Sequence, residues 1–298
     1  MFNADLIDDL AREKVVLFLG AGVSASAATA SGGKIAGWED FLSKSARSLE
    51  SKIKSQVDDL IQKKDYLLAC EILKTTLAEA WSQRITDEFG QRAAPSGLHR
   101  AIISLRQRLI ITTNFDKLLE TAWESLDERD THYPSTLTVI DENVFKSLKD
   151  HSRKYIIKIH GTVDNPNSLV FSRSEYIRSA FGNLRYTEFL ESLLLNYTFL
   201  FIGFSMNDPA ITSLMEMYAL KFPTARPHYI FAAGPIAENI IEINKRLRKL
   251  VHIVYDPAND HAELTLKVSE LAKSVTERRR GMFAEWIGLT SGGFDTGA

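Results

Sequence analysis

The sequence is short of cysteine: Cys70 is the only one in 298 residues. A single cysteine cannot form an intrachain disulfide, and it excludes a zinc ribbon built on cysteine pairs. Long apolar runs are also absent, so no segment is expected to span a bilayer. The first ten residues carry Asp5, Asp8 and Asp9 where a secretory signal would carry positive charge. We therefore expect a cytoplasmic protein with no membrane segment.

An excess of one charge sign is missing too. The chain has 36 basic and 38 acidic residues, for a net charge of −2. This balance predicts no direct binding of nucleic acid. The histidines other than His160 show no metal-ligand spacing, and no metal is predicted. The apolar fraction of 45% and charged fraction of 25% are typical of a globular protein that buries a substantial core.

Strand-like and helix-like segments alternate along most of the chain. Apolar runs bounded by polar or glycine residues predict strands at 15–19, 109–113, 155–159, 197–203, 228–231 and 252–255, with a shorter one at 136–140. Apolar spacing and capping residues predict helices at 3–12, 115–125, 141–150, 184–196, 235–249 and 260–275, and helix starts near 173 and 209. This alternation predicts an α/β fold, a Rossmann-like doubly wound parallel sheet.

One long block interrupts the alternation. Helices are expected at 38–49, 52–63 and 65–89, and no strand is expected between 25 and 105. We interpret residues 38–105 as a helical inserted subdomain. Residues 1–275 then form one domain that includes this insert, and residues 276–298 add a C-terminal helix and a tail expected to be disordered from 291.

The first strand runs into a glycine loop, Gly20-Ala21-Gly22, with Ser24 close behind. Glycine lets backbone N–H groups approach a ligand closely, and a helix that starts there directs its positive end at an anion. The loop suits a phosphate or pyrophosphate. The alternative is a tight strand-to-helix turn without a ligand, because the third glycine of the dinucleotide fingerprint is missing.

Three further strands also end in polar or glycine residues. The clusters are Thr113-Asn114-Phe115-Asp116, His160-Gly161 and Gly203-Phe204-Ser205. Because the carboxyl ends of parallel strands share one edge, these clusters and the glycine loop are expected to meet where open α/β sheets bind ligands.

In order and approximate spacing, these four clusters resemble the sirtuin family over roughly residues 12–260. The Thr-Thr-Asn-Phe-Asp string and the Gly-Phe-Ser…Asp-Pro segment resemble the bacterial branch found in anti-phage defence, whose members hydrolyse NAD. Protein-deacylating sirtuins carry two Cys-x-x-Cys pairs and a Pro-Asp-Phe-Arg segment, and this sequence has neither. The resemblance therefore implies NAD as substrate rather than an acyl-lysine cleft.

The resemblance assigns roles to individual residues. It implies that Asn114 orients the ribose and the attacking water; the alternative is an Asn that caps the following helix. His160 is expected to be the base, since imidazole transfers protons near neutral pH. Asp116 either orients Asn114 or the nicotinamide, or neutralises its own helix end.

The remaining assignments concern binding. Gly20, Ala21, Gly22 and Ser24 are assigned to the pyrophosphate, and Gly203 and Ser205 to the adenosine side. Tyr255 and Asp256 are candidates to flank adenine. Asp208 is expected only to cap a helix, and Trp38 to lie in the core.

The sequence predicts an NAD⁺ glycohydrolase that releases nicotinamide and ADP-ribose. The alternatives are an NAD-dependent protein deacylase and a non-catalytic subunit that binds NAD or ADP-ribose. Because free NADase activity would be toxic to its own cell, we expect regulation by homo-oligomerisation or by a partner. The family resemblance suggests a DNA-translocating ATPase as that partner.

Overall fold

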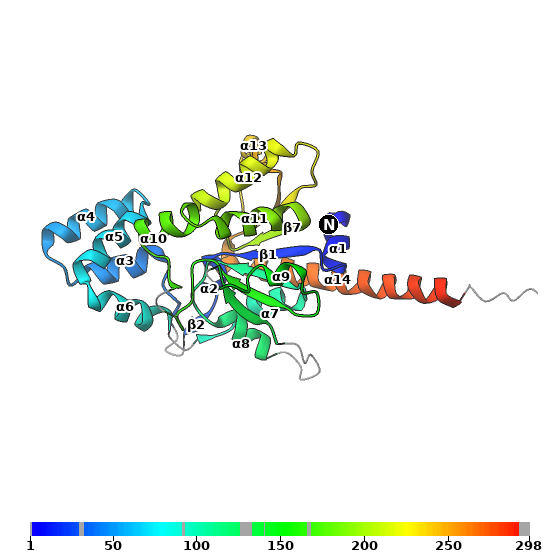
Figure 1. Cartoon of the computed structure of the whole chain (residues 1–298), viewed down its shortest axis with the longest axis horizontal. Coiled ribbons are helices and arrows are strands. Elements are labelled where there is room, and N and C mark those ends of the chain that lie inside the picture. The colour runs from blue at the N-terminus through cyan, green and yellow to red at the C-terminus, as the bar shows by residue number, and fades with distance from the viewer. Residues whose placement is uncertain are drawn as a thin grey trace, which may run out of the picture.

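The computed structural model describes residues 2–29, 33–90, 93–125, 133–139, 141–165 and 168–291. Its centre is a seven-stranded sheet in the order β5-β6-β4-β1-β7-β8-β9, in which every neighbouring pair is parallel. The strands are β1 (Val15–Leu19), β4 (Leu109–Thr112), β5 (Ser135–Thr138), β6 (Tyr155–Lys158), β7 (Thr198–Ile202), β8 (His228–Ala233) and β9 (Leu250–Tyr255). The predicted doubly wound parallel sheet is confirmed (Figure 1).

Helices cover both faces of the sheet and form the insert (Figure 1). They are α1 (Ala4–Ala11), α2 (Ala21–Ser24), α3 (Trp38–Ala46), α4 (Ser51–Gln62), α5 (Tyr66–Leu77), α6 (Glu79–Phe89), α7 (Gly97–Ser104), α8 (Leu118–Glu124), α9 (Lys146–Lys149), α10 (Arg173–Tyr176), the π-helical turn η2 (Ile177–Phe181), α11 (Leu184–Asn196), α12 (Pro209–Lys221), α13 (Glu238–Arg248) and α14 (Ala258–Ser291).

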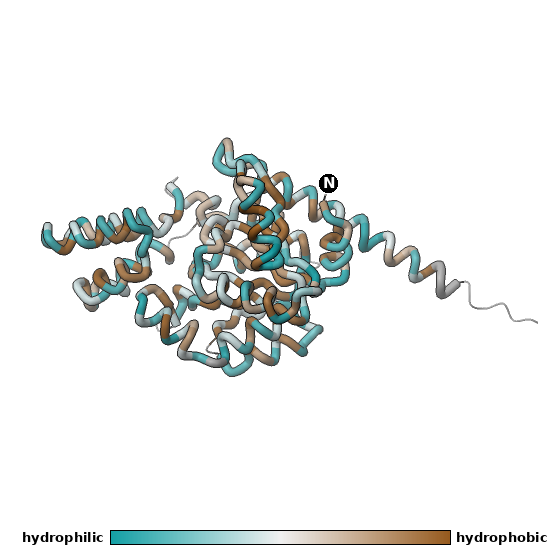
Figure 2. The backbone as a smooth tube through the Cα atoms, turned by 90° about the horizontal axis from the view of Figure 1, so that it is seen from above, coloured by the Kyte–Doolittle hydropathy of each residue, from teal (hydrophilic) through white to brown (hydrophobic). Residues whose placement is uncertain are grey.

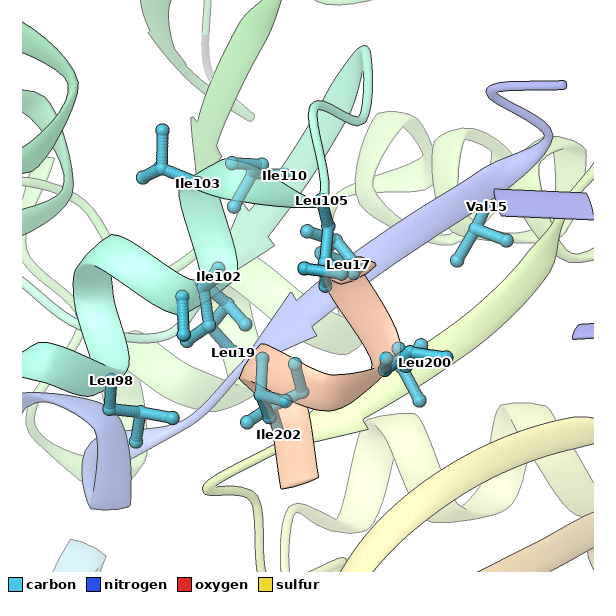
Figure 3. Packing of buried hydrophobic residues seen from close by; sticks show 14 of the residues in the cluster. Val15, Leu17, Leu19, Leu98, Ile102, Ile103, Leu105, Ile110, Leu200 and Ile202 are labelled. Atoms are coloured by element: carbon cyan, nitrogen blue, oxygen red, sulfur yellow. The ribbon is translucent and has the colours of Figure 1, made fainter. Parts of the chain in front are cut away.

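The central strand β1 supplies both hydrophobic layers. Successive side chains of a strand point to opposite faces, so Val15, Leu17 and Leu19 pack on one side with α7 and α14 (Figure 3). Val16 and Phe18 pack on the other side with α11 and α12. All five residues are buried, as expected for a strand inside a parallel sheet.

The insert has a separate core rich in aromatic side chains. Helices α3 to α6 lie to one side of the sheet, opposite the projecting end of α14 (Figures 1 and 2). Phe41, Trp81 and Phe171 are buried in this core, and Trp38 packs against it as predicted. Helix α7, by contrast, packs with the core of the sheet.

Two expectations for residues 25–105 are wrong. Strands β2 (Ala28–Thr29) and β3 (Ala93–Ala94) form a small antiparallel pair. At two residues each, they are too short to produce an alternating pattern. The helix expected at 65–89 is broken at Ala78, whose φ of 47° ends α5 and begins α6.

Two other boundaries differ from those predicted. The helix expected from residue 115 begins at Leu118. The segments expected to form separate helices before and after residue 275 belong to the one helix α14. Parts of the predicted strand at 136–140, the turn at 164–167 and the tail at 291–298 lie outside the described residues. No helix in the described ranges is long and apolar enough to cross a membrane.

Candidate active site

The sheet order places the four polar clusters side by side. Strands β6, β4, β1 and β7 are consecutive neighbours, so the residues that follow them share one edge. Backbone hydrogen bonds continue past the strand ends, from Thr113 N–H to the Leu19 carbonyl at 3.2 Å and from Ile159 N–H to the Thr112 carbonyl at 3.0 Å. The chain builds one half of the sheet before residue 160 and the other half after it. The clusters therefore lie at a topological switch point.

The glycine loop packs backbone to backbone against the loop after β7. Gly22 N–H donates to the Gly203 carbonyl at 2.9 Å, and a Cβ on Gly20 would lie 2.4 Å from that carbonyl oxygen. Gly203 has a φ of +61°, which favours glycine. This contact uses the Gly22 N–H within the protein, while Ala21 and Gly22 remain exposed at the loop surface. The glycines therefore have a packing role, whatever the loop binds.

Asn114 is buried and bound to the glycine loop. Its Nδ2 donates to the Gly20 carbonyl at 2.9 Å, and its backbone N–H donates to Thr112 Oγ1 at 3.0 Å. It does not cap α8, which begins four residues later and has Lys117 at its N-cap. The structure thus removes the capping alternative and places Asn114 against the predicted phosphate loop.

Both carboxylate oxygens of Asp116 are used within the protein. Oδ1 accepts the backbone N–H of Leu118 at 3.0 Å, and Oδ2 accepts the hydroxyl of Ser24. The first contact binds the free N–H of a helix start, which is one of the roles expected. The second contact ties the glycine loop to the segment that carries Asn114. Ser24 is buried in this contact.

His160 faces a carboxylate that the sequence analysis treated only as a helix cap. His160 Nε2 lies 3.4 Å from Asp208 Oδ2, at ion-pair distance but without the geometry of a hydrogen bond. Asp208 does cap α12, since Oδ1 accepts N–H groups from Ala210 and Ile211 at 3.1 Å. Tyr176 also donates its hydroxyl to Oδ1 at 2.5 Å. The carboxylate is thereby fixed beside the imidazole.

Burial and these contacts have opposite effects on the pKa of Asp208. Burial raises the pKa of its carboxyl, but His160 and the donors around it outweigh burial and leave the pKa below its ordinary value. Burial, followed by the nearby Asp208, raises the pKa of the Tyr176 hydroxyl. Asp208 is therefore ionised and Tyr176 neutral at pH 7, which suits a carboxylate that holds a histidine.

Lys158 was not singled out from the sequence, although it ends an otherwise apolar strand. Its side chain is fully buried, with Nζ 3.0 Å from Glu120 Oε1. Nζ also donates to the backbone carbonyl of Asp116 and lies 3.5 Å from that of Phe115. A charged group in this place fixes the loop after β4. The detectable signal was a lysine between Ile157 and Ile159.

The remaining assigned residues lie further from this centre. Ser205 is exposed on the loop after β7, while Gly203 contacts the glycine loop. Tyr255 is the last residue of the edge strand β9 and Asp256 follows it, two strands away from β7. The Tyr255 hydroxyl lies 3.0 Å from His261 Nδ1. Among the described residues, no group of three or more His, Cys, Asp or Glu could hold a metal ion.

An open parallel sheet with two glycine loops at its switch point defines an α/β protein with a Rossmann-like doubly wound fold. Comparison with protein families narrows this class, because residues 108–254 match the model of the SIR2-like domain. Over these residues, which make up just under half of the chain, the protein is similar to the sirtuin-like family.

Curated relatives cover most of this chain. NAD(+) hydrolase ThsA of Cytobacillus dafuensis is 27% identical over 228 residues, which make up 76% of this chain and 42% of the relative. ThsA of Bacillus cereus is 26% identical over 230 residues, or 77% and 45%. Defense-associated sirtuin 2 of Bacillus subtilis is 24% identical over 157 residues, or 51% and 15%. The chain thus spans less than half the length of these relatives.

A solved structure of cytosolic 5'-nucleotidase IIIB bound to cytidine aligns with 91% of this chain, at a TM-score of 0.37 and 11% identity. A likeness this remote has no bearing on the fold or the site.

Proposed function

We propose that this chain hydrolyses NAD⁺ at the nicotinamide–ribose bond, giving nicotinamide and ADP-ribose. The observation that carries the proposal is the position of Asn114 and His160 just after the neighbouring strands β4 and β6, beside a glycine loop at the switch point of the sheet. The names of the relatives, which are NAD(+) hydrolases, support it.

In this proposal the pyrophosphate lies along the exposed Ala21–Gly22 surface, which orients the nicotinamide riboside toward Asn114. Cleavage of the glycosidic bond builds positive charge on the ribose, and nicotinamide leaves with the bonding electrons. Asn114 positions the ribose and a water molecule, whose oxygen forms the new bond to the anomeric carbon. His160 accepts the proton of that water or of a ribose hydroxyl.

We assign Asp208 a positioning role in this reaction. It lies beside the imidazole and is itself held by Tyr176 and by the start of α12. A fixed anion at this distance stabilises the imidazolium that forms when His160 takes a proton. The buried Ser24–Asp116 contact holds the glycine loop and the Asn114 loop together, so that both ends of the substrate meet one rigid edge.

The test is nicotinamide release from NAD⁺ by the full chain, alone and with candidate partners. Asn114→Ala and His160→Ala should each abolish release, since they remove groups that contact the substrate. His151→Ala and Asn196→Ala are matched controls, because both residues are exposed and outside the described site. Full activity in either site variant would contradict the proposal.

The same assay separates the alternatives. Nicotinamide release that requires an acylated lysine peptide would indicate a deacylase. Tight NAD binding in calorimetry with no turnover under any condition would indicate a non-catalytic binding subunit.

We further propose that the activity serves anti-phage defence in the cytoplasm and is restrained until infection. A relative named as a defence-associated sirtuin supports this role. Restraint would come from homo-oligomerisation or from a partner protein such as a DNA-translocating ATPase. To test this, the wild-type chain is expressed with and without the proteins encoded by neighbouring genes, and cellular NAD⁺ is measured. A lone monomer with full activity would contradict restraint.

A further inference from the structure

Helix α10 lies where the insert meets the rest of the molecule, packed against α5 (Figure 1). Its last residue, Tyr176, is 4% exposed. The Tyr176 hydroxyl donates to Asp208 Oδ1 and accepts the N–H of Ala210 at 2.9 Å. The ring of Tyr176 also meets the ring of His160 edge to face, with the centroids 6.0 Å apart. A displacement of α10 therefore changes the surroundings of both members of the Asp208–His160 pair.

Glu71 of α5 binds α10 with both of its carboxylate oxygens. Oε2 accepts the backbone N–H of Ser174 at 2.8 Å, and Oε1 accepts the Ser174 hydroxyl at 3.1 Å. The N–H groups in the first turn of a helix have no partner within the helix, so Ser174 depends on an acceptor from elsewhere. The Ser174 N–H in turn lowers the pKa of the Glu71 carboxyl below its ordinary value. Glu71 is therefore ionised at pH 7 and accepts through both oxygens.

A second carboxylate, Glu175, also joins α10 to the insert. Its Oε2 accepts the N–H groups of Ser172 at 2.9 Å and of Phe171 at 3.1 Å, while Lys74 of α5 donates to Oε1. Glu175 belongs to α10 and to its capping box, so its replacement would disturb the helix itself. Glu71 contacts α10 from the insert, so its replacement tests the connection between the two.

We propose that Glu71 is a positioning residue for the proposed reaction and acts on His160 through α10. By holding α10, it keeps Tyr176 in contact with Asp208 and thereby fixes the carboxylate beside the imidazole. Ser174 and Tyr176 lie two residues apart in one helical turn, so a displacement of the first displaces the second. The catalytic consequence rests on the proposed function, whereas the connection to His160 exists whether or not NAD⁺ is hydrolysed.

The first experiment follows the imidazole signals of the full chain by NMR and requires no turnover. The His160 signal is identified as the one that is missing from His160→Ala. Glu71→Ala should shift this signal, whereas Glu71→Gln keeps an oxygen acceptor for the Ser174 N–H and should leave it near its wild-type position. Glu79→Ala is the matched control, because Glu79 is an exposed glutamate of the insert, in the first turn of α6. An unchanged His160 signal in Glu71→Ala would overturn the proposal.

The second experiment measures kcat and KM of the same variants with NAD⁺. Glu71→Ala should lower kcat by about tenfold and leave KM nearly unchanged, because a misplaced base slows the chemical step. Glu71→Gln and Glu79→Ala should stay close to wild type. Full kcat in Glu71→Ala, or a loss of kcat with an unchanged His160 signal, would contradict a positioning role. If wild type does not hydrolyse NAD⁺, the proposed function fails, and the NMR result alone decides the role of Glu71.

The third experiment tests the route through Tyr176 by a double-mutant cycle. Tyr176→Phe removes the hydroxyl that binds Asp208, so adding Glu71→Ala to it should shift the His160 signal little further. Additive shifts would show that the effect of Glu71 does not pass through Tyr176. Circular dichroism verifies that each variant is folded. If Glu71→Ala does not fold, Glu71→Asp, whose shorter side chain draws the carboxylate away from Ser174, is measured in its place and should also shift the signal.

Discussion

The rings of Phe115 and Phe171 stack with their centroids 4.3 Å apart and their planes at 22°. Phe115 lies between Asn114 and Asp116, while Phe171 contacts Trp38, Phe41, Trp81 and Phe89 of the insert. The loop that carries the proposed ribose-binding residue is thus part of the aromatic core of the insert. We expect a displacement of that core to move Asn114, because the adjacent Phe115 packs in the core.

Replacing Phe171 should destabilise the insert and the loop together. Phe171 is 1% exposed, so Phe171→Ala should lower the free energy of unfolding by about 3–5 kcal/mol. Phe283→Ala, at an exposed position, should change it by less than about 0.5 kcal/mol. Urea denaturation measures both variants. Equal stability of the two would disprove the central role of Phe171.

The contact between the glycine loops predicts that alanine cannot replace Gly20. Its Cβ would lie 2.4 Å from the Gly203 carbonyl oxygen and 2.7 Å from Phe204 Cα, so the two loops must separate. We expect a loss of stability of about 1–3 kcal/mol, together with loss of NAD⁺ hydrolysis. Gly281 is the control, because it lies inside α14 and a Cβ there would have nothing within 4 Å. Gly281→Ala should be neutral or stabilising, by up to about 1 kcal/mol. Thermal unfolding measures the two variants, and a Gly20→Ala protein as stable as wild type would contradict this account.

The buried pair of Lys158 and Glu120 should show strong coupling. Lys158→Met leaves Glu120 without its charged partner and should cost about 3–5 kcal/mol. Adding Glu120→Gln to this variant should recover part of the loss, and a double-mutant cycle measures the recovery. The exposed pair of Lys63 and Asp59 provides a reference, whose coupling should stay below about 1 kcal/mol. If the coupling energy of Lys158 and Glu120 is no larger than that of Lys63 and Asp59, Lys158 does not hold the loop.

The Asp208–His160 contact predicts a functional defect without a folding defect. Asparagine caps helices as well as aspartate does, so Asp208→Asn should keep α12 intact. Loss of the anion should slow NAD⁺ hydrolysis by at least about tenfold and leave KM nearly unchanged, because Asp208 acts on the imidazole and not on the substrate. Asp65→Asn is the matched control, since Asp65 caps α5 away from the site. An unchanged rate of NAD⁺ hydrolysis in Asp208→Asn would leave Asp208 with its capping role alone.

Two buried histidines predict a loss of stability in mild acid. Burial lowers the pKa of His228 to about 3. Burial also lowers the pKa of His99 to about 4, against the opposing charge of Asp116. The unfolded chain binds these protons near pH 6.5 and the folded chain does not, so the stabilising contribution is complete above 6.5 and falls as the pH drops toward 4 and 3.

Each of these histidines should account for about 2 kcal/mol of the stability lost between pH 7.5 and 5. His228→Gln keeps an acceptor for the Phe199 N–H, which donates to His228 Nδ1 at 3.0 Å. This variant should lose less stability than wild type over the same interval in urea denaturation. An identical pH dependence would show that His228 does not stay neutral.

The strands and the shared edge could be predicted because apolar runs such as Val15–Leu19 end directly in glycine or polar residues. Contacts between distant segments could not. Asp208 reads as a helix cap from its neighbour Pro209, and only the fold brings it to His160. The Ala78 break and the β2–β3 pair are too local to alter an apolar pattern. The packing role of Gly22 depends on Gly203, which lies far along the chain.

The position of β1 has a consequence for synthesis. This strand leaves the ribosome first, yet its neighbours β4 and β7 follow much later, and Leu19 pairs with both Thr112 and Ile202. The glycine loop has no backbone to pack against until Gly203 has been made. A nascent chain therefore holds an unfinished sheet from the synthesis of Leu19 until that of Ile202, and the four clusters meet only once β7 is complete.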